Sequence, residues 1–236
     1  MLKTSLPQLM GEILAACKKS NRIPANIRLV AVSKNQPLAA IKEAFDLGIF
    51  DFGENKVQEA EGKIPIVASL IQGKSPMPPI NWHFIGRLQT NKVKKAVSLF
   101  NLIHSVDSLA LAKKIDAEAK KQNKVQKVLL QVNVSGEMSK AGFDEKELVD
   151  SFPKISSLKN LQLLGLMEIA PILGKGESEE KSRRHFKALR ILRDALQSKF
   201  SHQLPELSMG MSQDYPVAIE EGATMVRIGS AIFGKR

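Results

Sequence analysis

Cysteine and aromatic residues are scarce in this chain of 236 residues. Cys17 is the only cysteine, which excludes an internal disulfide and a cysteine-rich metal site. A lone cysteine favours a reducing compartment, so we expect a cytoplasmic protein. Aromatic residues make up 5% of the chain, with one Trp and one Tyr. Because the bases of single-stranded nucleic acid stack on aromatic side chains, this composition argues against a nucleic-acid groove.

Long apolar runs are absent as well. No stretch is long and apolar enough to span a bilayer, so we expect no membrane segment. Leu14–Cys17 has the composition of a lipoprotein cleavage box, but Pro7 and nearby polar residues interrupt the apolar run that a signal peptide requires. Apolar residues instead recur at helical spacing from Leu6 to Cys17, which predicts an amphipathic N-terminal helix.

Positive charge is in excess. The 35 Lys and Arg outnumber the 24 Asp and Glu, and the net charge is +11. Such a charge suits anionic small molecules, nucleic acid or acidic partners. The lysine pairs fall in separate helical patterns, so solvated helix faces explain them better than one nucleic-acid groove does. A nucleic-acid or partner-binding module is the alternative, and a steep salt dependence of binding would support it.

Short β-branched runs alternate with longer helical patterns along the chain. The expected strands are Arg28–Ser33, Ile49–Gly53, Trp82–Gly86, Leu102–Ser105, Val125–Val134, Leu161–Met167, Glu206–Ser208 and Thr224–Ile228. The expected helices include Pro37–Leu47, Ser108–Gln122, Glu145–Ile155 and Glu179–Lys199. Eight strands separated by helices predict an α/β fold, a single (β/α)8 TIM barrel over residues 1–236 as one domain, preceded by the N-terminal helix. A doubly wound open sheet has a similar pattern and is the alternative.

Two irregular stretches interrupt this alternation. Residues 72–80 contain three prolines and are expected to be a spacer before a strand. Residues 172–180 contain two glycines and follow a strand, which predicts a mobile loop at the active site.

Lys34 closes the first expected strand and is the most informative residue of the chain. Side chains alternate along a strand, so Val30, Val32 and Lys34 share one face. Apolar surroundings disfavour the charged form of an amine and so yield the neutral nucleophile that a Schiff base requires. The alternative interpretation is a lysine at a strand end whose amine reaches water.

Glycine and hydroxyl residues follow the last two expected strands. Met209–Ser212 and Gly229–Ser230 each combine them, and each precedes a helical pattern. Backbone N–H groups at such positions bind phosphate, and the loops after strands seven and eight of a barrel do so repeatedly. A turn followed by an N-cap is the alternative for each segment.

Arg227 shares a strand face with Met225 and Gly229. If the barrel closes, Arg227 approaches the ligand of Lys34. An arginine against a pyridine nitrogen keeps that nitrogen unprotonated, because a guanidinium does not give up its proton. The alternative is an arginine that binds a carbonyl or a helix-terminal carboxylate. His83 is expected to be a hydrogen-bonded core residue, and since no ligand spacing accompanies it we expect no metal.

Several motifs, taken in order, resemble the YggS/PROSC family of pyridoxal 5′-phosphate (PLP) homeostasis proteins over nearly the whole chain. They are Ala31–Lys34, Phe52–Asn55, Trp82–Gly86, Leu88–Lys92, Gly165–Met167, Ser208–Ser212 and Met225–Gly229. The resemblance implies a barrel like the N-terminal domain of alanine racemase without its β-domain, with PLP held as a Schiff base on Lys34. The candidate cofactor-binding residues are Lys34, Asn55, Met209, Ser212, Arg227, Gly229 and Ser230.

Two residues depart from the family pattern. Lys56 stands where an aromatic residue is expected, and Arg87 stands where a proline or a small residue is common. Lys140 is expected to be a loop lysine that reaches the anionic ligand or solvent. We expect all three side chains at the rim of the pocket.

The resemblance also argues against fast catalysis. A racemase needs a base on each face of the cofactor, and in the racemase fold the second base comes from a β-domain for which this chain has no room. Tyr215, the only tyrosine, matches no catalytic position of the family. We therefore expect no catalytic residue.

We therefore expect a non-enzymatic carrier or regulator of PLP and amino-acid balance, with PLP-dependent apoenzymes or regulatory proteins as partners. We also expect a monomer, because nothing in the sequence indicates that the bare barrel has to dimerise. A weak, racemase-like PLP enzyme acting on amino acids is the main alternative. A lysine-dependent aldolase-like barrel without a cofactor is another.

Overall fold

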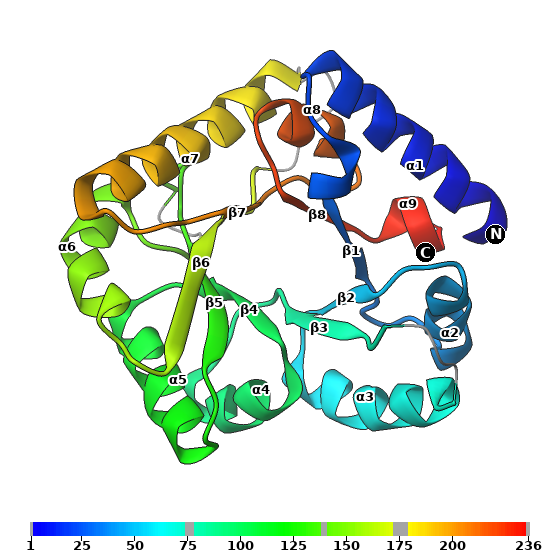
Figure 1. The fold of residues 1–236 in the computed structure, drawn as a ribbon, viewed down its shortest axis with the longest axis horizontal. Coiled ribbons are helices and arrows are strands. Elements are labelled where there is room, and N and C mark those ends of the chain that lie inside the picture. Colours follow the sequence, from blue (N-terminus) through cyan, green and yellow to red (C-terminus); the bar gives the residue numbers. More distant parts are fainter. Residues whose placement is uncertain (1, 74–77, 138–140, 172–178, 235–236) are drawn as a thin grey trace.

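The computed structural model describes residues 2–73, 78–137, 141–171 and 179–234, and Figure 1 shows a ring of helices around an inner ring of strands. The strands are β1 (Arg28–Val32), β2 (Asp51–Glu54), β3 (Asn81–Phe84), β4 (Leu102–Val106), β5 (Gln126–Gln131), β6 (Leu161–Met167), β7 (Glu206–Ser208) and β8 (Met225–Ile228). The helices are α1 (Leu2–Lys19), α2 (Leu38–Asp46), α3 (Val57–Ile71), α4 (Val93–Leu99), α5 (Leu109–Lys121), α6 (Glu145–Ser156), α7 (Glu179–Phe200), α8 (Tyr215–Glu220) and α9 (Ser230–Phe233), with short 3-10 turns at Pro24–Asn26 and Thr90–Lys92.

The strands form one closed parallel barrel in sequence order. Closure depends on the last pairing, in which Val30 of β1 lies opposite Arg227 of β8. The predicted (β/α)8 barrel is therefore confirmed, and the doubly wound open sheet is excluded because an open sheet leaves two edge strands unpaired. The C-terminal ends of all eight strands meet at one mouth of the barrel, where the residues that follow them can converge.

Most expected strands differ from the observed ones by one or two residues at an end. The largest difference is at β5, which was expected to continue to Val134 but ends at Gln131. Val132 forms only an isolated bridge to Phe143, because the chain turns there to leave the sheet.

Two apolar clusters hold the barrel. The larger lies between the strands and the surrounding helices and contains Phe45, Phe52, Phe84, Phe100, Phe152 and Phe186. The smaller contains Leu102, Leu129, Met167 and Met225 from the four strands β4, β5, β6 and β8. Since alternate residues of a barrel strand point inward, this second cluster fills part of the barrel interior.

The predicted N-terminal helix is confirmed as α1, which packs against α8 and α9 (Figure 1). Cys17 is buried within it. The hydroxyl of Ser5 donates to the carbonyl of Ile232 at 2.8 Å, and Arg22 donates to two carbonyls near the end of α8 at 2.8 and 2.5 Å. In the part of the chain that the structure describes, no helix has the length and apolar character needed to cross a membrane.

Candidate functional site

A cavity of about 390 Å³ opens at the C-terminal ends of β1 and β8, beside the loop that follows β7. Of the seven candidate residues, it brings together Lys34, Ser212, Arg227, Gly229 and Ser230. These residues come from three separate segments, and closure of the barrel between β8 and β1 makes them neighbours. The cavity is also lined by Val32, Gln36, Met211, Gln213, Asp214 and Gly234.

Lys34 lies in the turn that follows β1, and this strand is one residue shorter than the expected Arg28–Ser33. Strand β1 ends at Val32, Ser33 is fully buried, and Lys34 is exposed. The expected burial of the amine in apolar surroundings is therefore wrong, and the exposure of Lys34 agrees with the alternative interpretation, a lysine that reaches water. Lys34 and Val32 still line the same cavity.

The chain turns at Ser33 because polar groups of β2 and α3 take its hydroxyl and its carbonyl. The Ser33 hydroxyl donates to the Glu54 carboxylate at 2.7 Å, and the Lys63 ammonium donates to the Ser33 carbonyl at 2.8 Å. Lys63 also pairs with Glu54 at 2.7 Å, and both side chains are buried. Burial raises the pKa of Glu54, while hydrogen bonds from Lys63 and Ser33 lower it. This polar cluster fixes the residue immediately before Lys34.

The residue after Lys34, Asn35, is also held by a side chain of α3. The N–H of Asn35 donates to Glu59 at 2.5 Å, and Glu59 pairs with Lys63 at 2.8 Å. Asn35 has a φ of 55°, a left-handed conformation that asparagine tolerates better than most residues. Burial alone would raise the pKa of Glu59, but hydrogen bonds from Lys63 and Asn35 lower it. The turn that carries Lys34 is thus clamped on both sides by α3.

Arg227 lines the cavity and only 4% of its surface is exposed. One terminal nitrogen donates to the Ser208 hydroxyl at 2.5 Å, and the other donates to the main-chain carbonyl of Glu168 at 2.6 Å. The alternative interpretation, an arginine bound to a carbonyl, therefore also describes part of its contacts. Burial lowers the pKa of Arg227 to about 10, and Asp214 and Glu168 oppose this change. The guanidinium therefore remains positively charged at neutral pH.

The loop after β7 and the end of β8 are joined by hydrogen bonds. The N–H of Gly229 donates to the Ser212 hydroxyl at 3.3 Å, and the N–H of Arg227 donates to the Gly210 carbonyl at 3.0 Å. Gly210 has a φ of +89°, which a residue with a side chain rarely adopts. This conformation places Ser212 next to the start of α9, so both glycine and hydroxyl segments face one cavity.

Sequence reasoning missed Asp214, a buried carboxylate on the cavity wall. It precedes α8 and accepts the N–H of Met211 at 2.7 Å. Burial raises its pKa, whereas the Met211 hydrogen bond and the charge of Arg227 lower it. An aspartate just before a helix with proline near its start is a helix N-terminus signal, and this signal could have drawn attention to Asp214.

Two candidate residues lie away from this cavity. Met209 is fully buried in the main core, and its N–H donates to the carbonyl of Met225 at 3.1 Å. It follows Ser208, which contacts Arg227, and consecutive residues of a strand point to opposite faces. Met209 therefore points away from the cavity, and its predicted contact with the cofactor has no geometric support.

Asn55 lines a second cavity of about 270 Å³ on the same mouth, together with Arg87 and His185. The loops after β2 and β3 touch here, since a Cβ on Gly86 would lie 2.1 Å from the carbonyl oxygen of Asn55. Asn55 is thus near the barrel mouth but separate from the cavity of Lys34.

The structure describes two of the three residues expected at the pocket rim. Lys56 and Arg87 line a further cavity of about 340 Å³ with Lys92, near the start of α3. Lys140 lies outside the described residues, and so does most of the expected active-site loop at residues 172–180. Residues 74–77 of the expected spacer are likewise outside them.

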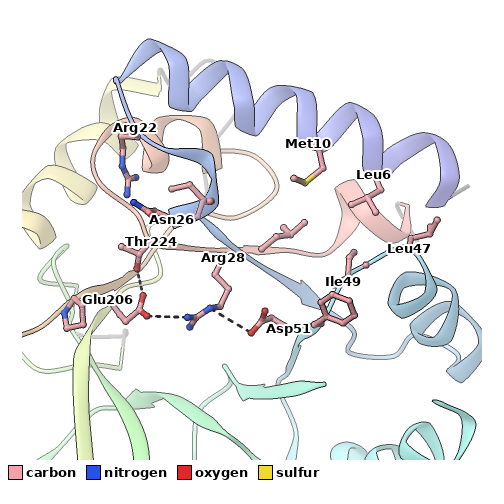
Figure 2. Close-up of a pocket in the computed structure, with 16 residues that line it drawn as sticks. Leu6, Met10, Arg22, Asn26, Arg28, Leu47, Ile49, Asp51, Glu206 and Thr224 are labelled. Atoms are coloured by element: carbon pink, nitrogen blue, oxygen red, sulfur yellow. Dashed lines mark hydrogen bonds and ion pairs between the residues drawn. The ribbon is translucent and has the colours of Figure 1, made fainter. Parts of the chain in front are cut away.

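The opposite mouth of the barrel has a larger cavity of about 810 Å³ (Figure 2). It lies at the N-terminal ends of the strands, between α1 and the first residues of β1, β2 and β7. None of the seven candidate residues lines it. Across the described ranges, no group of three or more His, Cys, Asp or Glu side chains is arranged to hold a metal ion.

Comparisons with known proteins give a consistent result. The family model "Alanine racemase, N-terminal domain" matches residues 17–236. Pyridoxal phosphate homeostasis protein of Aquifex aeolicus is 44% identical over 98% of this chain and 96% of its own length. The protein of the same name from Escherichia coli is 39% identical over 98% of this chain and 95% of its own length.

Solved structures agree with these relatives. PipY of Synechococcus elongatus, solved with PLP bound, superposes with a TM-score of 0.81 at 41% identity, covering 95% of this chain and all of PipY. Alanine racemase of Clostridium difficile superposes with a TM-score of 0.70 at 14% identity, covering 96% of this chain and 56% of the racemase, which supports the fold alone. This chain, whose residues 17–236 match the alanine racemase N-terminal domain, therefore belongs to the pyridoxal phosphate homeostasis protein family.

Proposed function

We propose that this protein binds PLP between Lys34 and Arg227, holds it as a Schiff base on Lys34, and takes part in PLP and amino-acid homeostasis without robust turnover. The observation that carries the proposal is the meeting of a lysine amine, a buried guanidinium and two glycine and hydroxyl segments around one cavity. PipY, a relative 41% identical to this chain, was solved with PLP bound.

The residues fit the chemistry of PLP. Bound PLP supplies an aldehyde, a pyridine nitrogen that acts as an electron sink, and a phosphate dianion. The Lys34 amine can form a C=N bond with the aldehyde carbon, and the aldehyde oxygen leaves as water. Hydroxyl and backbone N–H groups at Ser212, Gly229 and Ser230 suit the phosphate. A volume of about 390 Å³ lies in the usual range for small-molecule sites.

Two observations support a carrier over an enzyme. Arg227 stays cationic and can donate a hydrogen bond to a pyridine nitrogen, but it does not give up its proton. The nitrogen therefore stays unprotonated, and the ring is a weaker electron sink. The hydroxyl of Tyr215 donates to Glu12 of α1 and does not line the cavity. Burial and Glu12 both raise the pKa of Tyr215. The only tyrosine of the chain is thus unsuited to act as a base on bound PLP.

The remaining expectations are proposals as well. We propose a monomer that exchanges PLP with PLP-dependent apoenzymes or regulatory proteins. Exchange requires access to the cavity, and the exposure of Lys34 is compatible with it. The lone, buried Cys17 is compatible with a cytoplasmic location.

Borohydride reduction of the purified protein with PLP, followed by peptide mass analysis, tests the site. We expect one pyridoxyl group on Lys34 and none in the Lys34→Ala variant. The control is Lys92→Ala, which removes a lysine from another cavity at the same mouth and should retain the adduct. An adduct on a different lysine in the unaltered protein would refute the assignment.

Turnover separates the carrier from a weak, racemase-like enzyme. Amino-acid racemisation and transamination are measured with the PLP-loaded protein and with free PLP at the same concentration. A carrier gives rates no higher than those of free PLP. Substrate-dependent turnover above that level, lost in Lys34→Ala, would establish the enzyme.

A further inference from the structure

A continuous series of buried hydrogen bonds runs from Arg227 to the opposite mouth of the barrel. The Arg227 guanidinium contacts the Ser208 hydroxyl at 2.5 Å, and that hydroxyl lies 2.9 Å from Nδ1 of His104. Nε2 of His104 lies 2.8 Å from Nδ1 of His83, and Nε2 of His83 lies 2.9 Å from Asp51. We call these five residues the interior chain. Strands β8, β7, β4, β3 and β2 each contribute one of them.

Burial makes every hydrogen bond of the interior chain matter. Arg227, Ser208, His104 and His83 are at most 4% exposed. A buried polar group that loses its partner costs about 1–3 kcal/mol, and more if it is charged. Only Asp51 at the far end has a partly exposed side chain, at 19%.

The two ends of the interior chain fix the direction of every hydrogen bond. A guanidinium can only donate, so the Ser208 oxygen accepts from Arg227. When each imidazole carries one proton, Nδ1 of His104 accepts and the Ser208 hydroxyl donates to it. His104 then carries its proton on Nε2 and donates to His83. His83 likewise donates through Nε2 to Asp51, which as a carboxylate only accepts. All donors point from the cofactor cavity toward the N-terminal mouth.

The reverse arrangement leaves a proton without an acceptor. If His83 carried two protons, His104 would accept at Nε2 and donate from Nδ1 to Ser208. The Ser208 oxygen would then accept from both neighbours, and among the residues that the structure describes no third group accepts the hydroxyl proton. Burial, together with the positive charges of Arg227 and Arg28, holds the pKa of His104 well below its ordinary value.

We propose that Ser208, His104 and His83 are positioning residues that aim the Arg227 guanidinium into the cavity, with Asp51 as the fixed acceptor at the far end. This inference rests on the proposed function for its consequence, which is that a change at the N-terminal mouth alters the surroundings of PLP at the other mouth. Hydrogen bonds that point in one direction polarise one another, so the interior chain transmits a change in charge at Asp51 to Arg227.

The N-terminal mouth provides a matched control. Figure 2 shows Arg28 between two carboxylates there. Its guanidinium lies 3.9 Å from Asp51 and 3.5 Å from Glu206. The side chains of Asp51 and Glu206 are 19% and 17% exposed. Asp51→Asn and Glu206→Gln therefore remove the same charge next to the same arginine, and only Asp51→Asn alters the interior chain.

The direction of the hydrogen bonds is tested without any cofactor. Nitrogen NMR of the histidine rings in the PLP-free protein at neutral pH should show Nε2 protonated and Nδ1 unprotonated in both His83 and His104. His202, which lies outside the interior chain, serves as the assignment control. A doubly protonated His83, or His104 protonated on Nδ1, would overturn the proposed direction whether or not the protein binds PLP.

The coupling is tested by the absorption spectrum and the dissociation constant of bound PLP. Ser208→Ala should weaken binding about tenfold and shift the absorption band, since Arg227 loses a charge-assisted hydrogen bond. Asp51→Asn should change both quantities in the same direction by about two- to fivefold in affinity, and Glu206→Gln should leave them unchanged. Equal effects of Asp51→Asn and Glu206→Gln would refute the coupling.

A rescue variant separates positioning from folding. Glutamine at position 104 retains one acceptor and one donor, whereas leucine retains neither. His104→Gln should bind PLP as the unaltered protein does, and His104→Leu should resemble Ser208→Ala while remaining folded by circular dichroism. If His104→Leu fails to fold, Ser208→Ala carries the comparison. If the unaltered protein binds no PLP, the proposed function fails, and the NMR result still decides the interior chain.

Discussion

Lys63 donates a hydrogen bond to the main-chain carbonyl of Ser33 at 2.8 Å, one residue before Lys34. The same ammonium pairs with the buried carboxylate of Glu54. A lysine on a covering helix therefore neutralises a buried acid and holds the end of the strand that carries the candidate nucleophile. Stability and cofactor binding are joined at this point of the barrel.

Lys63→Met should lower the free energy of unfolding by about 3–5 kcal/mol, because it leaves a buried carboxylate without its cation. The measurement is urea unfolding at neutral pH. Lys95→Met is the control, since its pair with Glu61 is about half exposed on both sides and such pairs contribute about 0.2–1 kcal/mol. Equal losses in the two variants would contradict the role of burial.

The loss in Lys63→Met should shrink in acid. Burial already raises the pKa of Glu54, and without Lys63 nothing but the Ser33 hydroxyl opposes that rise. A carboxyl whose folded pKa is raised destabilises the fold above that pKa, and the effect vanishes once the pH falls below the unfolded pKa of about 4.3. Adding Glu54→Gln to Lys63→Met should restore stability at neutral pH, and its failure to do so would point to lost packing.

Gly210→Ala should destabilise the protein and weaken PLP binding together. A Cβ at Gly210 would lie 2.5 Å from the Cβ of Ala218, and the φ of +89° is unfavourable for alanine. Gly48→Ala is a matched control, because Gly48 has a φ of +90° and no atom within 4 Å of the added Cβ. The control should cost about 1 kcal/mol through backbone strain alone. Similar unfolding energies and unchanged PLP affinity in both variants would show that the loop tolerates the collision.

Local patterns were sufficient to predict the barrel but not the ends of its elements. Alternating β-branched runs and helical periods identify strands and helices because each depends on nearby residues. The end of β1 depends instead on Lys63, which is 30 positions from Ser33 in the chain. The sequence therefore predicted Lys34 at the correct mouth of the barrel and in the wrong local environment.

The interior chain was less accessible to sequence reasoning. His83 was predicted to be a hydrogen-bonded core residue, and this is confirmed by its contacts with His104 and Asp51. Its partners could not be named, since Ser208 is 104 positions from His104 and they meet only after the strands have closed into a barrel. Strand register, more than residue type, decides which polar residues face one another inside.

Acid should unfold the protein partly through His104. Burial holds the pKa of His104 in the folded protein well below its ordinary value. In mild acid the imidazole is therefore protonated in the unfolded chain but stays neutral in the folded protein. Stability is unaffected above the unfolded pKa of about 6.5 and falls by up to about 1.4 kcal/mol per pH unit below it. Urea unfolding between neutral pH and about pH 5 should therefore be less pH-dependent in His104→Gln.

A second histidine variant controls for general effects of acid. His202 is partly exposed and lies outside the interior chain. Among the described residues, its ring forms one hydrogen bond, a 3.4 Å contact with the carbonyl of Leu163. His202→Gln should retain the pH dependence of the unaltered protein. If the free energy of unfolding depends on pH equally in the two variants, the lowered pKa of His104 is not the cause of the acid sensitivity.

The phosphate contacts can be isolated by comparing PLP with pyridoxal, which has the same aldehyde and ring but no phosphate. Ser212 lines the cavity and already accepts the N–H of Gly229, so Ser212→Ala removes a hydroxyl and loosens the adjoining backbone. We expect about tenfold weaker binding of PLP, because one hydrogen bond to a charged group is lost. The affinity for pyridoxal should change little. Ser156→Ala, on the exposed end of α6, should change neither affinity. Equal weakening for both ligands would mean that Ser212 supports the loop and does not bind the phosphate, because only a phosphate contact distinguishes the two.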